Sequence, residues 1–385
     1  MDVGEQDLAG AGACNKGVLV KNMKFVIYTN VVSPHVMPLA RRLAAKLGDV
    51  DFAYVTTDRI TAQRRSLGWD DSARFGWLGD ANADPVATRK MLGGADVVFG
   101  NIRDFDLFEQ RVRLGRTTIY CSERWFKPVC VLRLGCRMVC LPGWIRLFVP
   151  WYFRMARRVA ALIRGDKSFY YYPIGKWAQR DMLLICNLFG VPRKHAISRM
   201  RMWGYFVEPS SCPKDIVAET EVNGCLRVLW VGRMLGWKRV DTTIRAVKKC
   251  DNVEFDIYGE GPMESVWREL AGDCSRIHFH GQVKIERVRE LMRNHHVYVL
   301  SSNEEEGWGA ALNEAIEEGM KTIGTYEAGS SVTILPESNL YHAGDWRRLK
   351  QLLEDGHLEK VEIGEWSPDR GAGKLMESMN NLKES

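Results

Sequence analysis

Two basic residues and two glutamates in the second half of the chain have the types and spacing of an anion- and polyol-binding site. Arg233 and Lys238 lie five residues apart in VGRMLGWK, directly after an apolar run. Both cations can meet on one diphosphate, which arginine binds through two N–H groups and lysine as a point charge. Glu306 and Glu314 lie in EGWGAALNEA, and their carboxylates can accept hydrogen bonds from vicinal sugar hydroxyls. A solvated basic turn and an acidic helix start are the simpler interpretations of each pair alone.

Glycines accompany these charged residues in three short segments. They allow the backbone to approach a ligand closely, and backbone N–H groups at a helix start bind anions. The glycines in question are Gly232 after the first apolar run, Gly259 and Gly261 in GEGP, and Gly307 and Gly309 on either side of Trp308. Each segment alone is a weak signal, and their common order along the chain is the stronger one.

The elements that must position these segments alternate regularly between strands and helices. Short apolar runs predict strands at 226–232, 253–259, 277–281, 297–301 and 322–325, and amphipathic spacing predicts helices at 240–250, 263–271, 285–294 and 310–319. The first half has similar runs at 25–29, 50–56, 95–100, 117–122 and 168–174, with a helix at 38–47. This alternation predicts parallel sheets with right-handed crossovers, whose ligands bind beyond the carboxyl ends of the strands. We therefore expect an α/β protein with two doubly wound, Rossmann-like domains that face a central cleft.

The segments VGRMLGWK, YGEGP, FHGQV and EGWGAALNEA together resemble the ordered motifs of glycosyltransferase family 4, a retaining family with the GT-B fold. The resemblance covers about residues 226–331. It implies that Arg233 and Lys238 hold the diphosphate of a nucleotide-sugar donor, that Glu306 contacts the transferred sugar, and that Glu314 binds the ribose. It also implies backbone contacts to the phosphate near Gly307, Trp308 and Gly309 and to the base near Gln282 and Val283.

The domain boundaries follow from composition and from this resemblance. We expect a loose N-terminal tail at 1–22, an acceptor-side domain at 23–207, a polar linker at 208–224 and a donor-binding domain at 225–365. The resemblance implies that residues 366–385 form a helix that crosses back to the first domain.

The first half departs from the family pattern at two places. VVSPH (31–35) stands where many members have a glycine pair, and Asn101 lies near the place of a family histidine. His35 and Glu123 are alternative polar partners for the donor sugar. Two D-x-D matches, at 49–51 and 104–106, lie in the wrong half for a donor metal, so we expect no cofactor and no essential metal.

Basic charge is concentrated in the first half. Residues 1–224 contain 33 Lys and Arg against 21 Asp and Glu, whereas residues 225–385 contain 21 against 27. Between Arg124 and Arg164 there are nine basic residues, several aromatic residues and no acid. Such a segment is typical of a membrane interface, although a core helix pair with a basic face is an alternative. The candidates for contact with an anionic membrane or an acceptor are Arg124, Lys127, Trp144, Arg146, Trp151, Arg154, Arg157 and Arg158.

We expect a hexosyltransferase that moves a sugar from a nucleotide-sugar to a glycan or lipid-linked acceptor in cell-surface polysaccharide or glycolipid synthesis. Ten dispersed cysteines without a C-x-x-C pair indicate a reducing compartment, so the expected location is cytoplasmic, peripheral to the membrane. The alternatives are a sugar phosphorylase or sugar-phosphate synthase, and a partner-binding subunit without turnover. No nucleic-acid module is present, and no G-x-G-x-x-G follows the first strand of either half, which disfavours a dinucleotide oxidoreductase.

Overall fold

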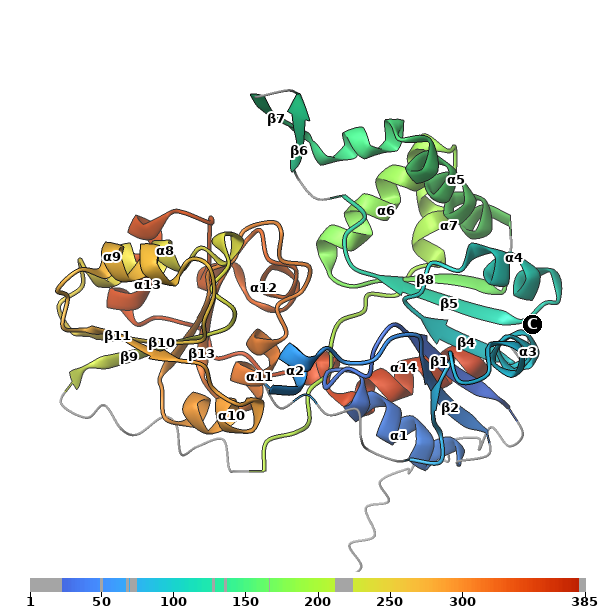
Figure 1. Cartoon of the computed structure of the whole chain (residues 1–385), viewed down its shortest axis with the longest axis horizontal. Helices are drawn as coiled ribbons and strands as arrows, with labels where there is room; N and C mark the ends of the chain where they lie inside the picture. The colour runs from blue at the N-terminus through green and yellow to red at the C-terminus, as the bar shows by residue number, and fades with distance from the viewer. Residues whose placement is uncertain are drawn as a thin grey trace, which may run out of the picture.

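The computed structural model describes residues 23–48, 51–66, 69, 75–126, 129–134, 137–165, 167–211 and 224–380. They form two lobes, each built on a six-stranded parallel sheet with helices on both faces (Figure 1). The strand order is β3-β2-β1-β4-β5-β8 in the first lobe and β11-β10-β9-β12-β13-β14 in the second. The expected pair of doubly wound α/β sheets is therefore confirmed.

The first sheet is apolar on both sides because helices cover both. Phe25 and Ile27 of β1 pack toward α1 and α14, whereas Val26 and Tyr28 pack toward α3 and α4. The strands are β1 (Phe25–Thr29), β2 (Phe52–Thr56), β3 (Leu78–Asp80), β4 (Val97–Gly100), β5 (Thr117–Ser122) and β8 (Phe169–Pro173). The helices are α1 (Met37–Leu47), α2 (Ala62–Ser66), α3 (Pro85–Gly94), α4 (Phe105–Arg113), α5 (Pro150–Gly165), α6 (Lys176–Leu188) and α7 (Arg193–Ser198).

The second sheet is covered in the same way. Trp230 and Phe255 belong to the core beneath α8, α9 and α13, and Leu229 and Tyr298 belong to the core beneath α10 and α11. The strands are β9 (Leu226–Val231), β10 (Val253–Tyr258), β11 (Ile277–Gly281), β12 (Val297–Leu300), β13 (Lys321–Thr325) and β14 (Leu340–Tyr341). The helices are α8 (Val240–Val247), α9 (Glu264–Ala271), α10 (Ile285–Arg293), α11 (Ala311–Glu317), α12 (Gly329–Ile334) and α13 (Trp346–Asp355).

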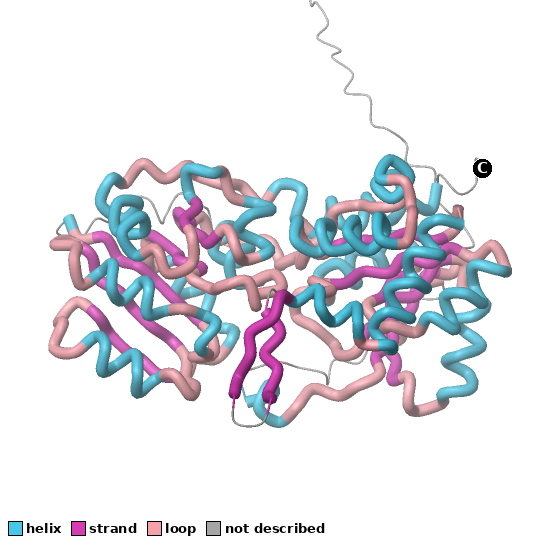
Figure 2. Tube along the Cα trace, turned by 90° about the horizontal axis from the view of Figure 1, so that it is seen from above, coloured by secondary structure: helices cyan, strands magenta, loops and turns pink. Residues whose placement is uncertain are grey.

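The basic aromatic segment departs from the helix-pair alternative. Its first part is an antiparallel hairpin of β6 (Val129–Leu134) and β7 (Arg137–Pro142), which projects from the first lobe on the side of the second (Figures 1 and 2). A 3-10 turn, η1 (Gly143–Phe148), and the long helix α5 follow. The sequence did not predict these two strands because its basic and aromatic composition dominated the pattern. No helix within the described ranges is long and apolar enough to cross a membrane.

The chain returns to the first lobe at its carboxyl end. Helix α14 (Pro368–Asn380) packs against α1, and Figure 1 shows it beneath the first sheet. Tyr172 of β8 and Ser378 of α14 share a hydrogen bond of 2.7 Å between their hydroxyls. Gly371 of α14 lies flat on the Phe206 ring, which a Cβ there would approach to 2.6 Å. The position of α14 thus ties the end of the second lobe to the sheet of the first.

Candidate functional site

The segments that follow the strands of the second sheet line one cavity of about 440 Å³. Gly232 and Arg233 follow β9, the GEGP turn follows β10, Gln282 and Val283 follow β11, and Glu314 comes from α11. These are the residues expected to bind the phosphate, base and ribose of a donor. They meet because the carboxyl ends of parallel strands lie at the same edge of the sheet.

Glycine is required where the first two loops touch. Gly259 has φ of 132°, and a Cβ on it would lie 1.8 Å from the Gly232 carbonyl oxygen. A Cβ on Gly261 would lie 2.5 Å from the Met234 carbonyl oxygen. The backbone itself therefore forms this wall of the cavity, which allows a ligand to approach the main-chain groups closely.

Lys238 and Glu306 do not line this cavity and instead form an ion pair beside it. Lys238 Nζ donates to Glu306 Oε2, and the Ser302 hydroxyl donates to the same oxygen at 2.8 Å. The Lys238 side chain is 18% exposed and that of Glu306 is 10% exposed. The exposed side chain of Arg233 lines the cavity, whereas that of Lys238 is turned to Glu306. That both cations hold one anion stays a prediction.

Glu123, one of the two alternative polar groups of the first half, meets the second lobe at this pair. It follows β5, and its Oε1 accepts a 2.8 Å hydrogen bond from the Tyr205 hydroxyl. A Cβ on Gly307 would lie 2.1 Å from Glu123 Oε2, so the carboxylate rests against the backbone of the EGWG loop. Desolvation in the cleft and the nearby Glu306 carboxylate raise the pKa of Glu123, against the opposing effects of Tyr205 and Lys238.

His35, the other alternative, lies opposite Glu314. Its Nδ1 is 4.0 Å from Glu314 Oε1, and its ring stacks on Tyr205 with centroids 5.7 Å apart. Burial lowers the pKa of His35 to about 4 and raises the pKa of Glu314 to about 7. The imidazole is therefore neutral at physiological pH, and the 4.0 Å contact is neither a hydrogen bond nor a salt bridge.

The first lobe contributes a second cavity, of about 520 Å³, on its side of the cleft. His35, Asn101, Glu123 and Tyr205 all line it, so the polar candidates of the first half come together. Trp69 lines both this cavity and the donor-side one, which places the two cavities next to each other. The arrangement can hold two ligands with their ends close to the Lys238–Glu306 pair.

Trp308, expected near the phosphate, has a structural side chain. The indole is 1% exposed, and its Nε1 donates to Asn313 Oδ1 at 3.0 Å. Asn313 Nδ2 in turn donates to the Tyr205 carbonyl oxygen at 2.9 Å, which links the two lobes. The ring also lies over Gly204, where a Cβ would approach it to 2.5 Å. Only the backbone of the Gly307–Gly309 turn remains available for a ligand.

Two aromatic groups of the site were not identified from the sequence. Tyr258 lines the donor-side cavity at a register shift between β10 and β11, and the His280 ring stacks on it with centroids 4.4 Å apart. His280 Nε2 lies 2.5 Å from Asp256 Oδ1, which fixes that ring. Trp69 belongs to none of the sequence motifs. A bulge leaves no periodic signal, and both residues are found only from the cavities that they line.

The basic candidates of the first lobe differ in their surroundings. Arg124 lies 3.7 Å from Asp181 and donates to the Glu304 carbonyl oxygen of the second lobe at 3.1 Å. Arg158 is held by Glu109 and Asp106 of α4, so its charge is compensated. Trp144 and Trp151 are half exposed, and Arg146 is partly buried in η1. Arg154 and Arg157 are exposed on α5, and Lys127 lies outside the described residues.

Comparison with known proteins identifies the architecture. HepE of Anabaena with bound UDP superposes with a TM-score of 0.60 at 14% identity, covering 94% of this chain and 98% of that one. The lipopolysaccharide outer core galactosyltransferase WaaB (TM-score 0.56, 14% identity) is covered to 99%, and a glycosyltransferase from Rickettsia africae (0.58, 12%) to 100%, each by 94% of this chain. The chain has the GT-B fold. Its cleft between two Rossmann-like lobes is where the two cavities lie.

The family evidence covers the second lobe of this GT-B chain. Residues 225–355 match the family model described as glycosyl transferases group 1. This range includes the predicted donor segments, from VGRMLGWK to EGWGAALNEA. A comparison with curated protein sequences gives no match.

The raised pKa of Glu314 predicts a pH-dependent effect of Glu314→Gln on stability. In the folded chain this carboxyl keeps its proton up to a pKa of about 7, whereas its ordinary pKa is 4.5. The contribution of the Glu314 carboxyl to the free energy of unfolding of the wild type therefore decreases as the pH rises from 4.5 to about 7, by up to about 3 kcal/mol. We expect Glu314→Gln to increase the free energy of unfolding near pH 8 and to change it little near pH 5, as measured by chemical denaturation.

The matched control for that measurement is Glu286→Gln, which changes an exposed glutamate of α10. It should alter the unfolding free energy similarly at both pH values. An identical difference from wild type at both pH values for Glu314→Gln would contradict the burial argument.

The contact between Glu123 and Gly307 predicts energetic coupling between the lobes. Gly307→Ala should reduce the free energy of unfolding by roughly 1–3 kcal/mol, because the added methyl group would overlap the Glu123 carboxylate. In the Glu123→Ala background, Gly307→Ala should reduce the free energy of unfolding clearly less than it does in the wild type. Gly373→Ala, where a Cβ meets nothing within 4 Å, is the control. Equal costs of Gly307→Ala in both backgrounds would show that the two residues do not interact.

Proposed function

We propose that this chain is a retaining glycosyltransferase that moves a sugar from a nucleotide-sugar donor to a glycan or lipid-linked acceptor in cell-surface polysaccharide or glycolipid synthesis. The observation that carries the proposal is the single cavity lined by Arg233, the GEGP turn, Gln282 and Glu314. It lies beside the Lys238–Glu306 pair and next to a polar cavity of the opposite lobe. The match of residues 225–355 to the glycosyl transferases group 1 model supports the same assignment.

The charges of the cleft suit departure of a nucleoside diphosphate. Arg233 and Lys238 would stabilise the negative charge that develops on the leaving diphosphate oxygen. Lys238 can do this because its present partner, Glu306, is also held by Ser302 and keeps a hydrogen bond if the lysine turns to a phosphate. Glu314 would accept hydrogen bonds from the ribose hydroxyls at the other end of the cavity.

We infer attack of the acceptor hydroxyl on the same face that the diphosphate leaves, with a diphosphate oxygen taking the proton. Glu306 is engaged by Lys238 and Ser302, which favours a role in binding the sugar over a role as nucleophile. Glu123, whose Oε1 is bound by Tyr205, is placed to accept a hydrogen bond from the acceptor. The proton therefore passes from the acceptor to the leaving group without a covalent enzyme intermediate.

We also propose that transfer requires no metal. The side chain of Asp104 caps α4 by accepting from the Leu107 N–H at 3.0 Å and pairs with Arg89, and Asp106 pairs with Arg158. Both carboxylates of this D-x-D segment therefore have partners within the first lobe. Residues 49–50 of the other match lie outside the described residues. The cationic side chains Arg233 and Lys238 would supply the charge that a metal provides elsewhere.

Nucleotide binding is the decisive test of the donor site. We would titrate the full chain calorimetrically with UDP-, GDP-, ADP- and dTDP-sugars, with and without EDTA, beginning with uridine donors because HepE was solved with UDP and with UDP-glucose. One donor should bind with or without EDTA. Lys238→Ala and Glu314→Ala should each weaken it by about 10- to 100-fold, the loss expected for a hydrogen bond to a charged group.

Lys249→Ala and Glu286→Ala are the controls, because both side chains are exposed outside the cavity. They should leave the affinity unchanged. Absence of binding by every donor at millimolar concentration would overturn the proposal. Donor binding without hydrolysis or transfer would instead indicate the partner-binding subunit.

We further propose that the chain works at the cytoplasmic face of an anionic membrane. Trp151, Phe153, Arg154 and Arg157 are all exposed at the start of α5, close to the exposed side chains of η1. Aromatic and basic side chains on one surface suit the lipid interface. The positive charge balance of residues 1–224 acts in the same direction.

Vesicle sedimentation measures this association. Replacing both Arg154 and Arg157 by glutamine should weaken binding to vesicles rich in anionic lipid, by roughly 1 kcal/mol for each cation. Binding to zwitterionic vesicles should be weak and unchanged. The control replaces Lys46 and Lys90 by glutamine, which removes two exposed charges of the same lobe from α1 and α3. Equal partition of wild type into both kinds of vesicle would refute the membrane proposal.

A further inference from the structure

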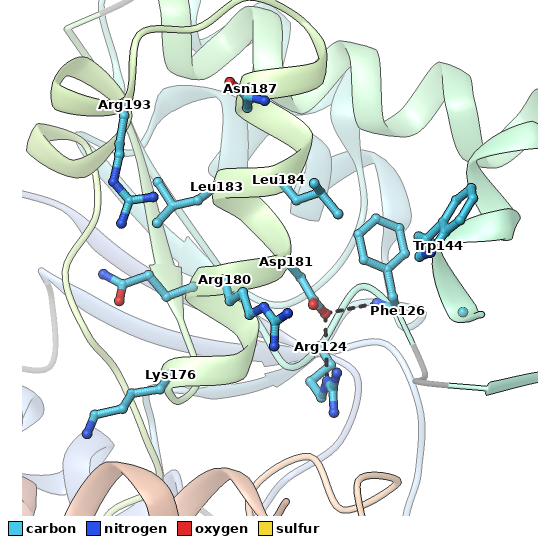
Figure 3. Close-up of a pocket in the computed structure, with 12 residues that line it drawn as sticks. Arg124, Phe126, Trp144, Lys176, Arg180, Asp181, Leu183, Leu184, Asn187 and Arg193 are labelled. Carbon is cyan, nitrogen blue, oxygen red and sulfur yellow. Dashed lines mark hydrogen bonds and ion pairs between the residues drawn. The ribbon is translucent and has the colours of Figure 1, made fainter.

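The first lobe contains a third cavity, of about 630 Å³, that is separate from both cavities of the cleft described above. It lies between η1 and α6, with one residue of α7 at its border (Figure 3). One side is basic and the other is apolar. Neither the donor nor the polar acceptor-side cavity has this composition.

The basic side is formed by Lys176, Arg180 and Arg193. All three side chains are exposed, and within the described ranges no carboxylate lies at ion-pair distance from any of them. Arg180 also lies over the Trp177 ring, with 5.5 Å from its guanidinium carbon to the ring centroid, which restrains it beside the cavity. Three cations so placed attract an anion from solution.

The one acid among the lining residues, Asp181, interacts with Arg124 and Arg180 but is outnumbered by the four cations that line the cavity. Asp181 is buried, and its Oδ2 accepts from the Trp125 and Phe126 N–H groups at 3.0 Å each. Figure 3 shows the bond to Phe126. Arg124 lies 3.7 Å from the same oxygen. The carboxylate is thus used to hold residues 125–126 and Arg124 in place, and the cavity has a net positive charge.

The apolar side is formed by Phe126, Trp144 and Leu184. Trp144 and Leu184 remain 50% and 46% exposed, although they are large apolar side chains. Figure 3 shows Leu184 on the side of α6 that faces Phe126 and Trp144, whereas Leu183 extends from the other side, toward Arg193. The exposed side chains of Phe148 and Val149 continue this apolar surface at the end of η1. Such exposure next to a cavity marks a surface that another molecule covers.

We propose that this cavity binds a single anionic amphiphile, with a phosphate head group on Lys176, Arg180 and Arg193 and its hydrocarbon chain along Leu184, Phe126 and Trp144. Charge complementarity selects the anionic head, and the apolar side selects the chain. A free phosphate would leave the apolar surface uncovered, and a neutral lipid would leave three cations without a partner.

The location connects this site to the cleft. Arg124 lines both this cavity and the polar cavity of the first lobe, and it donates to the Glu304 carbonyl oxygen of the second lobe. The Lys176 N–H also donates to Thr333 Oγ1 of the second lobe at 3.0 Å. The head group of an amphiphile in this cavity would therefore lie beside Arg124, which also lines the polar cavity where the acceptor is expected. This identification of the acceptor as a phosphate-bearing lipid rests on the proposed function, whereas binding itself does not.

Calorimetric titration of the full chain with a short-chain phosphatidic acid below its micellar concentration tests the site. Short-chain phosphatidylcholine and inorganic phosphate are the comparison ligands. Phosphatidic acid should bind at least about 10-fold more tightly than either, since each loses one of the two interactions. Replacing both Arg180 and Arg193 by glutamine should weaken phosphatidic acid binding about 10-fold or more.

Two matched controls separate the cavity from general surface effects. Lys194→Gln changes an exposed cation adjacent to Arg193 that does not line the cavity, and it should have little effect. Leu184→Ser should weaken phosphatidic acid binding without changing the weak binding of inorganic phosphate. Leu188→Ser, one turn further along α6 and 53% exposed, should not.

Inorganic phosphate binding as tightly as phosphatidic acid would overturn the proposal in favour of a simple anion site. Equal affinity of phosphatidic acid for wild type and for the Arg180/Arg193 double variant would overturn it as well. Donor binding is measured on the same variants and should be unaffected, because none of these residues lines the donor cavity. Conversely, loss of donor binding in Lys238→Ala should leave phosphatidic acid binding intact, so the two proposals fail independently.

Discussion

The close approach of the two lobes at the EGWG loop determines how the cleft is assembled. Gly307 lies against the Glu123 carboxylate of the first lobe, and its own carbonyl oxygen lies where a Cβ of Gly329 would be, at 2.0 Å. Gly204 rests on the Trp308 ring in the same region. At Gly307 and at Gly204 the backbone of one lobe lies against a side chain of the other, with no room for a Cβ between them. The loop that follows β12 is consequently fixed from both sides, and the positions of Glu306 and Glu314 follow from it.

That approach also imposes an electrostatic constraint, because it buries ionisable groups from both lobes. Charges removed from water are costly unless they are paired or become neutral. Lys238 and Glu306 meet the constraint as a pair, whereas His35 and Glu314 meet it by shifts of pKa toward their neutral forms. For Glu123 the pKa is raised toward the neutral form, and the carboxyl group also accepts a hydrogen bond from Tyr205. An anionic donor therefore enters a site with few uncompensated charges, and binding requires Lys238 to exchange or share its partner.

The donor side of the site was predictable from the sequence because each motif immediately follows a strand. Parallel strands bring their carboxyl ends to one edge, so local order in VGRMLGWK, GEGP and EGWGAALNEA was sufficient to place Arg233, Gly259 and Glu314 around one cavity. The pairing of Lys238 with Glu306 was not predictable, since it joins residues 68 positions apart through rotamers that no periodicity encodes. The hydrogen bond from Tyr205 to Glu123, across 82 positions, depends likewise on how two sheets are packed. The β6–β7 hairpin was not predicted because the basic and aromatic composition of residues 124–164 indicated a membrane interface rather than strands.

The division of charge between the lobes then acquires a physical meaning. The second half of the chain has more acids than bases, so its attraction for an anionic donor must come from Arg233 and Lys238 at short range. The first half has an excess of basic residues, and some of its exposed cations lie around the third cavity and on α5. Long-range attraction brings the chain to an anionic surface, whereas short-range contacts select the donor. The two functions therefore respond differently to salt: association with an anionic lipid weakens as ionic strength rises, while a contact made by Lys238, which is 18% exposed, is screened less.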